Sequence, residues 1–201
     1  MAKQLAKPLI VAGTALAVAA VWWRKHPSAC PYNQRFWIQA PHPFITRARL
    51  LEALEPRRDE TVLEVGPGTG YYTLDVARAV ARLHIFDLQP EMLEHTLRRA
   101  TAAGVTNVEP RQGDARSRPY ADGTFDAAYL VTVLGEIPDQ DAALRELRRV
   151  LRPGGRLVAG ELFGDPHMVT EGALRDRARA AGLRFERRVG PPFGYFAVLR
   201  A

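Results

Sequence analysis

An acidic residue followed by three alternating glycines is the feature of this sequence most directly suited to chemistry. The stretch Val62–Gly70 reads V-L-E-V-G-P-G-T-G, with Glu64 two residues before the first glycine. Glycines at alternate positions let the backbone turn tightly and let a ligand approach it closely. If a helix follows the loop, its unpaired amide N–H groups and its positive end also face that ligand. The loop therefore predicts a binding site for a small polar molecule.

The spacing of the loop separates two kinds of ligand. Dinucleotide-binding loops read G-x-G-x-x-G and approach a pyrophosphate, whereas this loop reads G-x-G-x-G. The carboxylate of Glu64 would repel a pyrophosphate, but it would stabilise a cationic sulfonium or ammonium group. A cationic ligand is the favoured interpretation, and a nicotinamide-dependent oxidoreductase stays open as the weaker one.

Two further carboxylates stand where predicted strands end. Asp87 closes the second strand, 17 residues after Gly70, where a carboxylate can accept hydrogen bonds from both hydroxyls of a ribose. Gly113-Asp114-Ala115 follows the third strand and suits contact with an adenine edge. Either aspartate could instead cap a helix or a turn, which aspartates do often. Together with the glycine loop, they favour a nucleoside ligand.

The elements that must position these residues alternate along the chain. Helical spacing or glycine and proline boundaries predict helices over 45–54, 71–82, 90–103, 138–151 and 171–181. Short apolar runs predict strands over 61–65, 83–86, 107–111, 125–131, 156–161, 185–189 and 195–199, with a turn at 153–155. Alternation of this kind predicts a parallel sheet covered on both faces. Because only a short Gly-Pro-Pro connection separates the last two strands, they predict an antiparallel hairpin at one edge.

In this order, the motifs resemble those of the class I S-adenosylmethionine-dependent methyltransferases, the group that includes quinone, phospholipid and small-molecule methylating enzymes. Besides the glycine loop, the resemblance rests on F-D-L-Q-P-E-M-L (86–93), Q-G-D-A (112–115), F-D-A-A-Y-L-V (125–131) and L-R-R-V-L-R-P-G-G-R-L-V (147–158). It implies an α/β, Rossmann-like fold with a seven-stranded, mostly parallel sheet, an antiparallel edge hairpin and helices on both faces. It also implies methyl transfer with S-adenosylmethionine as cofactor, S-adenosylhomocysteine as product and no metal.

The resemblance further implies which residues hold the cofactor. The glycine loop would line its methionine part, and Glu64 would face its amino group directly or through water. Asp87 would hold the ribose. Leu88 and Met92 would cover the adenine, Asp114 would bond its exocyclic amine, and the end of the fourth strand would border the transferred methyl group. The predicted cofactor-binding residues are Glu64, Gly66, Pro67, Gly68, Gly70, Asp87, Leu88, Met92, Gly113, Asp114, Ala115, Val131 and Thr132.

Methyl transfer mainly requires alignment of the acceptor and exclusion of water. A general base is needed only when the acceptor holds its proton at neutral pH. The predicted catalytic residues are Glu136 and Glu161, with Asp165 and His167 as further candidates. Glu136 follows the fourth strand where many relatives carry histidine, and Glu161 closes the fifth strand at the ligand-binding edge of such sheets. Each could instead be a solvated or capping group.

An apolar N-terminus is the clue to the acceptor. Residues 8–23 carry no charge and are bracketed by Lys7, Arg24 and Lys25, with Trp22 and Trp23 at one end. As a helix they would span about 24 Å, against a hydrocarbon core of about 30 Å. We expect a membrane anchor, which favours a small or lipid-like acceptor and a catalytic domain in the cytoplasm. A signal peptide cleaved near residues 17–19 and a helix packed on the domain or on a second chain are the alternatives.

Composition sets the remaining expectations. The net charge is +6, but without the four basic residues of the first 25 positions the chain has 24 arginines against 22 acids, so no nucleic-acid partner is expected. One cysteine excludes a disulfide framework within the chain and a cysteine-rich metal site. We expect an anchor helix over 1–25, a proline- and aromatic-rich surface linker over 26–45 and a methyltransferase domain over 46–201. A non-catalytic, membrane-tethered protein that binds S-adenosylmethionine is the competing hypothesis.

Overall fold

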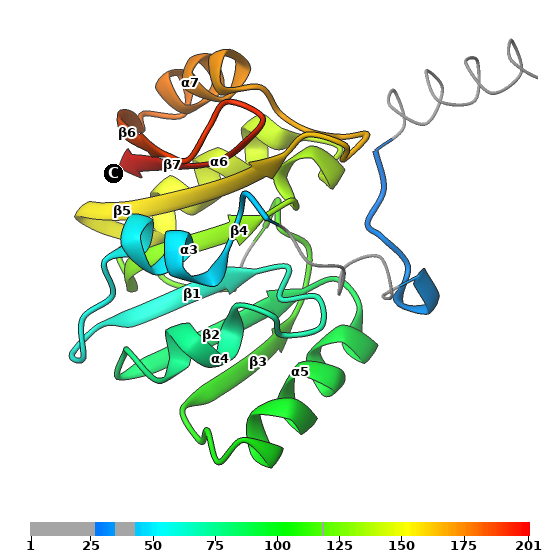
Figure 1. The fold of residues 1–201 in the computed structure, drawn as a ribbon. Helices are drawn as coiled ribbons and strands as arrows, with labels where there is room; N and C mark the ends of the chain where they lie inside the picture. Colours follow the sequence, from blue (N-terminus) through cyan, green and yellow to red (C-terminus); the bar gives the residue numbers. More distant parts are fainter. Residues whose placement is uncertain (1–26, 35–42, 118) are drawn as a thin grey trace, which may run out of the picture.

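The alternating strands and helices form one seven-stranded sheet with helices on both faces in the computed structural model, which describes residues 27–34, 43–117 and 119–201 (Figure 1). The strand order is β3-β2-β1-β4-β5-β7-β6. Strand β7 runs antiparallel to β5 and β6, and the pairs among the other neighbouring strands are parallel. The predicted fold and its edge hairpin are confirmed.

The bounds of the elements follow the sequence pattern closely. The strands are β1 (Thr61–Val65), β2 (Arg82–Asp87), β3 (Val108–Gln112), β4 (Phe125–Val131), β5 (Leu151–Leu162), β6 (Arg184–Val189) and β7 (Gly194–Arg200). The helices are α3 (Arg47–Leu54), α4 (Thr73–Ala77), α5 (Pro90–Ala102), α6 (Gln140–Val150) and α7 (Glu171–Ala180), with short 3-10 turns η1 (Tyr32–Gln34) and η2 (Leu134–Glu136).

Alternate side chains of the central strands enter two separate cores. On one face, strand residues such as Val62 and Tyr129 pack with α3, α4 and α5. On the other face, Leu63 and Leu130 pack with α6 and α7. Because successive strand residues point to opposite faces, a strand covered on both sides must be apolar throughout. This explains why the central strands are short apolar runs.

Side-chain caps set where three of the helices begin. Thr46 accepts a hydrogen bond from the amide of Arg49 at the start of α3, and Asp139 accepts one from Ala142 at 2.8 Å at the start of α6. Thr170 does the same at α7. Such caps satisfy amides that have no partner within the helix. They fix the helix ends that flank the carboxyl edge of the sheet.

Two predicted elements were wrong in extent. The helix expected over 71–82 is only α4, because the Asn107 amide donates to the carbonyls of Ala77 and Val80 at 2.8 and 3.0 Å and the chain then turns into β2. The fifth strand begins at Leu151, five residues earlier than expected. Leu151 pairs with Phe125, and the predicted Pro-Gly-Gly turn is an irregularity inside β5 before pairing resumes at Arg156.

The linker expected to lie on the surface is partly structural. Its last residue, Ile45, is fully buried in the core, where its carbonyl accepts a hydrogen bond from the Tyr72 hydroxyl at 2.6 Å. The predicted anchor, residues 8–23, lies outside the described residues. None of the helices described for residues 27–34, 43–117 and 119–201 is long and apolar enough to span a bilayer. The domain boundaries and the anchor stay predictions.

Candidate active site

A cavity of about 370 Å³ opens at the carboxyl edge of the sheet, between the ends of β1 and β4. The strand order reverses at this point, with β2 on one side of β1 and β4 on the other. Open α/β sheets bind ligands where the order reverses in this way, and the volume is in the range of small-molecule sites. The cavity brings together Gly66, Gly68, Asp87, Leu88, Met92, Gly113, Asp114, Ala115, Val131, Thr132 and Glu136, all predicted site residues.

The glycine loop forms one wall of this cavity in a conformation that needs glycine. Gly66, Gly68 and Gly70 all have positive φ, at 69°, 54° and 75°. A Cβ on Gly66 would lie 2.4 Å from a methyl of Val133, which also lines the cavity. Pro67 and Gly70 do not line the cavity, but the Gly70 amide donates to the Pro67 carbonyl and closes the turn. These two predicted binding residues therefore shape the loop.

Helix α5 supports the loop from behind. The Thr96 hydroxyl donates to the Gly68 carbonyl at 3.1 Å, and the Arg99 guanidinium donates to the Thr69 carbonyl at 2.6 Å. At the other end, the Gly66 amide donates to the Phe86 carbonyl. With these loop carbonyls held, the loop is pre-organised for a ligand before one binds, which lowers the entropic cost of binding.

Asp87 is held at the cavity with its carboxylate oriented by the backbone. Its Oδ1 accepts a hydrogen bond from the Gln89 amide at 2.8 Å. Burial raises the pKa of Asp87 to about 6, against the lowering effect of the Gln89 and Leu88 amides. A partly buried carboxylate that accepts hydrogen bonds suits a pair of ribose hydroxyls.

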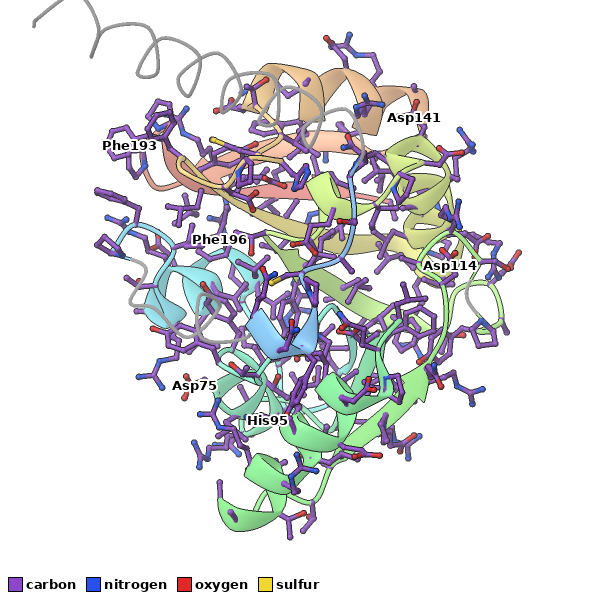
Figure 2. The ribbon with its side chains drawn as sticks, turned by 90° about the vertical axis from the view of Figure 1, so that its right-hand side faces the viewer. Asp75, His95, Asp114, Asp141, Phe193 and Phe196 are labelled. Atoms are coloured by element: carbon purple, nitrogen blue, oxygen red, sulfur yellow. The ribbon has the colours of Figure 1, made fainter. Side chains whose placement is uncertain are left out.

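The adenine end of the predicted site combines an apolar shelf with a charged rim. Met92 is buried in the wall of the cavity, whereas Leu88 is 56% exposed. Such exposure is unusual for a large apolar side chain unless a ligand covers it. Asp114 lies at the right of the site in Figure 2 and forms an ion pair with Arg116, with Nη2 and Oδ2 2.6 Å apart. Both carboxylate oxygens already accept hydrogen bonds from Arg116, through its backbone amide and its guanidinium, so contact of Asp114 with an exocyclic amine stays a prediction.

The end of β4 carries backbone strain at the cavity. Thr132 has a φ of 54°, in the left-handed region that a β-branched residue rarely adopts. Its amide donates to the Gly160 carbonyl and its hydroxyl to the Val131 carbonyl, each at 2.8 Å. Strain of this kind persists where surrounding contacts enforce it, often at binding sites. The structure thus places Val131 and Thr132 at the cavity, as predicted.

Glu64 lies behind the glycine loop and does not line the cavity. Its Oε2 accepts a hydrogen bond from the Thr73 hydroxyl at 2.6 Å on α4. Burial raises its pKa to about 7, the nearby charge of Asp87 also raises it, and the hydroxyls of Thr73 and Tyr129 lower it. Contact with a ligand's ammonium group stays a prediction, since the carboxylate is not among the residues that line the cavity.

Glu136 lies in the cavity wall and contacts the segment that was predicted only to be a surface linker. Its Oε2 accepts a hydrogen bond from the Cys30 amide at 3.2 Å. Burial raises the pKa of Glu136 to about 7, the Cys30 amide lowers it, and Asp165 and Asp87 raise it further. A carboxylate that exchanges its proton near neutral pH suits a general base.

Residues 27–30 form a further wall of the cavity, and Gln89 holds them there. The Gln89 side chain donates to the Cys30 carbonyl at 2.9 Å and accepts from the Tyr32 amide at 3.0 Å. The Tyr32 hydroxyl also lies 3.2 Å from His95 Nδ1. Gln89 was not among the predicted site residues, although it sits within the F-D-L-Q motif. The other lining residues that were not predicted are Val65, Phe86, Arg116, Val133, Ile137 and Pro138.

The second predicted catalytic carboxylate is off the cavity. Glu161 is 1% exposed and does not line the cavity; its Oε2 accepts a hydrogen bond from the Val169 amide at 3.0 Å. Burial raises its pKa to about 8, and Asp165 and Glu136 contribute in the same direction. Asp165 accepts from the amide of His167, which is also buried. The structure therefore places Glu136, and none of the other three candidates, in the cavity wall.

Comparison with known proteins identifies the class of site. Residues 62–155 match a sequence family described as a methyltransferase domain. The chain is 38% identical over 114 residues to the ubiquinone/menaquinone biosynthesis C-methyltransferase UbiE of Klebsiella pneumoniae, covering 55% of this chain and 45% of that protein. It is 38% identical over 135 residues to the demethylmenaquinone methyltransferase of Mycolicibacterium vanbaalenii, covering 67% and 51%.

A solved structure gives the same fold over nearly the whole domain. A methyltransferase from Aquifex aeolicus, described as S-adenosylmethionine-dependent, superposes with a TM-score of 0.77 at 21% identity, covering 86% of this chain and 98% of that one. Together, the seven-stranded sheet, the glycine loop and the cavity define a Rossmann-like methyltransferase. Residues 62–155 thus belong to a methyltransferase sequence family, and the domain around them has the fold of the class I S-adenosylmethionine-dependent methyltransferases. It spans only about half the length of the curated relatives it matches.

The residues present fit the cofactor of this class. The glycine loop leaves no room for a Cβ at Gly66, Asp87 presents a carboxylate in the same cavity, and Leu88 and Met92 supply an apolar shelf. No group of three or more histidine, cysteine or acidic side chains suited to a metal occurs in the part of the chain that the structure describes.

Proposed function

We propose that this protein transfers a methyl group from S-adenosylmethionine to an amphiphilic acceptor with an acidic hydroxyl, of the kind that a quinol precursor presents. The observation that carries the proposal is Glu136 in the wall of a mainly apolar cavity, with a pKa raised to about 7 by burial. The two relatives named above act on quinone precursors according to their names, which supports this class of acceptor. The predicted membrane anchor would hold the active site close to an acceptor that is dissolved in the bilayer.

The chain's own residues would perform three tasks in such a reaction. The bound cofactor supplies an electrophilic methyl group on a sulfonium. Val133 and Ile137 offer apolar surface near Thr132, where an acceptor ring would exclude water. The carboxylate of Glu136 would take the proton that the acceptor loses as its new bond to carbon forms, so that the products are a neutral methylated acceptor, a thioether and a protonated Glu136.

Mass spectrometry of membrane lipids tests the proposal directly. The full-length protein is incubated with extracted lipids and S-adenosylmethionine that carries an isotope-labelled methyl group. We expect an amphiphilic product heavier by one labelled methyl. Binding of S-adenosylhomocysteine without any labelled product would instead support a non-catalytic binding protein, and preference for a nicotinamide dinucleotide would support an oxidoreductase.

The role of Glu136 makes a separate prediction. Glu136→Gln keeps an oxygen that can accept the Cys30 amide but cannot take a proton. With the acceptor found above, we expect kcat to fall by about 100-fold or more. In the unchanged protein the rate should rise as the pH increases through about 7, because the carboxylate is the active form; in the variant this rise should vanish. Initial rates across the neutral pH range measure both effects.

The matched control is Glu94→Gln, an exposed glutamate on α5 that pairs with Arg98. It should leave both the rate and its pH dependence unchanged. If Glu136→Gln lowers affinity for S-adenosylhomocysteine but retains the rise in rate near neutral pH, Glu136 is a binding residue and the proton goes elsewhere.

A further inference from the structure

Three phenylalanine side chains are exposed together on loops at the carboxyl edge of the sheet. Phe163, Phe193 and Phe44 are 76%, 46% and 37% exposed. The rings of Phe44 and Phe193 meet edge to face with centroids 4.7 Å apart, and the Phe163 amide donates to the Phe193 carbonyl at 2.7 Å. We call these three side chains the phenylalanine patch. Phe193 is labelled at the upper left of Figure 2, which looks onto this edge.

The patch is held in place by its surroundings. A Cβ on Gly194 would lie 2.3 Å from the Cβ of Phe44, so glycine there permits the close packing of the two loops. The Arg49 guanidinium donates to the Phe44 carbonyl at 2.7 Å. The exposure of these rings is therefore a feature of an ordered surface, which monomeric proteins usually keep for interactions.

The segments directly around the three phenylalanines carry no charged side chain. Residues 43–46, 162–164 and 190–194 contain no acidic or basic side chain. The charged residues within two positions of them are Arg47, Arg188, the buried Glu161 and the partly buried Asp165. An uncharged aromatic surface with cations beside it suits the boundary between lipid headgroups and acyl chains. It suits a water-facing surface poorly.

The area favours a bilayer over a protein partner. The exposed parts of three phenylalanine side chains amount to roughly 300 Å². A stable protein interface buries about 800 Å² on each partner. A bilayer has no such minimum, because each aromatic side chain that enters the interface adds its own contribution.

The described part of the chain begins at the same edge. Pro27 lines the cavity at the carboxyl edge of the sheet, and the uncharged stretch 8–23 ends four residues before it. Four extended residues span at most about 14 Å. The predicted anchor is thus joined by a short connection to the edge that carries both the cavity and the phenylalanine patch.

We propose that the phenylalanine patch docks on the surface of a lipid bilayer and holds the carboxyl edge of the sheet, with its cavity, against that surface. The proposal rests on the proposed function, since an acceptor dissolved in the bilayer would then enter the site without crossing water. It identifies the partner of this face as a phospholipid surface.

A fluorophore placed on the patch tests this inference in the full-length chain. With Cys30 replaced by serine, a single cysteine is introduced by Phe163→Cys and labelled with nitrobenzoxadiazole. The matched control is Arg179→Cys, whose native side chain is 82% exposed on α7. This control lies near the start of β6, which pairs through β7 with the start of β5, at the opposite edge of the sheet. Vesicles of phosphatidylcholine and phosphatidylglycerol are then added to each protein.

We expect the emission of the probe at 163 to brighten and shift to shorter wavelength with vesicles, and the probe at 179 to stay unchanged. If the protein sediments with vesicles while both probes stay unchanged, the apolar N-terminus alone binds and the patch does not dock. A shift at 163 that follows protein concentration without vesicles would show a second copy on the patch. Either of these results overturns the proposal.

The probe result is independent of methyl transfer. If the probe at 163 enters the bilayer but no labelled product forms with any acceptor, the docking surface stands and the proposed function fails. If product forms but the probe stays in water, the function stands and the docking surface fails. The double variant Phe163→Ser, Phe193→Ser separates the two cases through KM. If the patch docks, KM should rise about tenfold for a long-tailed acceptor in vesicles and stay unchanged for a short-tailed one. If the patch does not dock, KM should stay unchanged for both acceptors.

Discussion

Replacing Asp87 with alanine is expected to weaken the binding of S-adenosylhomocysteine by about 100-fold. Asp87 ends β2 at the cavity with its carboxylate oriented by the Gln89 amide. Two hydrogen bonds from ribose hydroxyls to a charged acceptor account for a loss of this size. Isothermal titration calorimetry with S-adenosylhomocysteine measures it without any knowledge of the acceptor.

The same residue should make binding depend on pH. Burial raises the pKa of Asp87 to about 6, and only its carboxylate form can accept both hydroxyls. Affinity should therefore be full above pH 7 and should fall as the pH drops through about 6. In Asp87→Ala this dependence should flatten. Glu109→Ala, on the neighbouring strand β3 and paired with Arg82, is the control and should change neither quantity. A Kd for Asp87→Ala within threefold of the unchanged protein would place the ribose elsewhere.

The replacement of Gly135 by alanine is expected to destabilise the fold by about 2–3 kcal/mol and to lower Tm by about 5–10 °C. A Cβ at this position would lie 1.9 Å from the backbone carbonyl oxygen of His167 and 2.7 Å from its carbon. Backbone atoms cannot rotate out of the way, so η2 and the loop before α7 must separate. Thermal unfolding measures the change. Because Glu136 is the next residue, the cavity should be distorted as well, and S-adenosylhomocysteine should bind more weakly.

A second glycine serves as the matched control for this substitution. Gly172 lies in the first turn of α7, where an added Cβ meets no atom within 4 Å. Gly172→Ala should stabilise the protein by about 0.5–1 kcal/mol, because alanine loses less backbone freedom on folding. Equal effects of the two substitutions, in either direction, would show that the close contact at Gly135 does not exist in solution.

The bounds of the strands were predicted best where a strand is buried on both faces, because such a strand must be apolar throughout. Both β1 and β4 have the predicted bounds, because each is a short apolar run that ends at glycine or at the cavity. Helix α4 was overpredicted because helical spacing continues past Ala77, whereas the Asn107 side chain, 30 residues away, takes the Ala77 carbonyl. A local pattern contains no information about that contact.

The residues of the site likewise fall into those that the local sequence pattern predicts and those that depend on distant contacts. The glycine loop, Asp87 and the end of β4 were predictable because parallel strands end at one edge, so residues that follow different strands must meet there. The cavity wall at residues 27–30 was not, because Glu136 holds Cys30 from 106 positions away and Gln89 holds it from 59. Glu161 ends β5 and was expected at the same edge, yet its side chain enters the core beside Val169.

The sequence by itself thus predicted the class of protein, the cofactor and half of the residues that line the cavity. These follow from strand-end positions and residue chemistry, both of which are local. Only the tertiary structure decided which carboxylate reaches the cavity, which segment closes it and which aromatic side chains stay exposed. Those outcomes depend on how side chains from distant segments pack against one another, and spacing along the chain does not specify that packing.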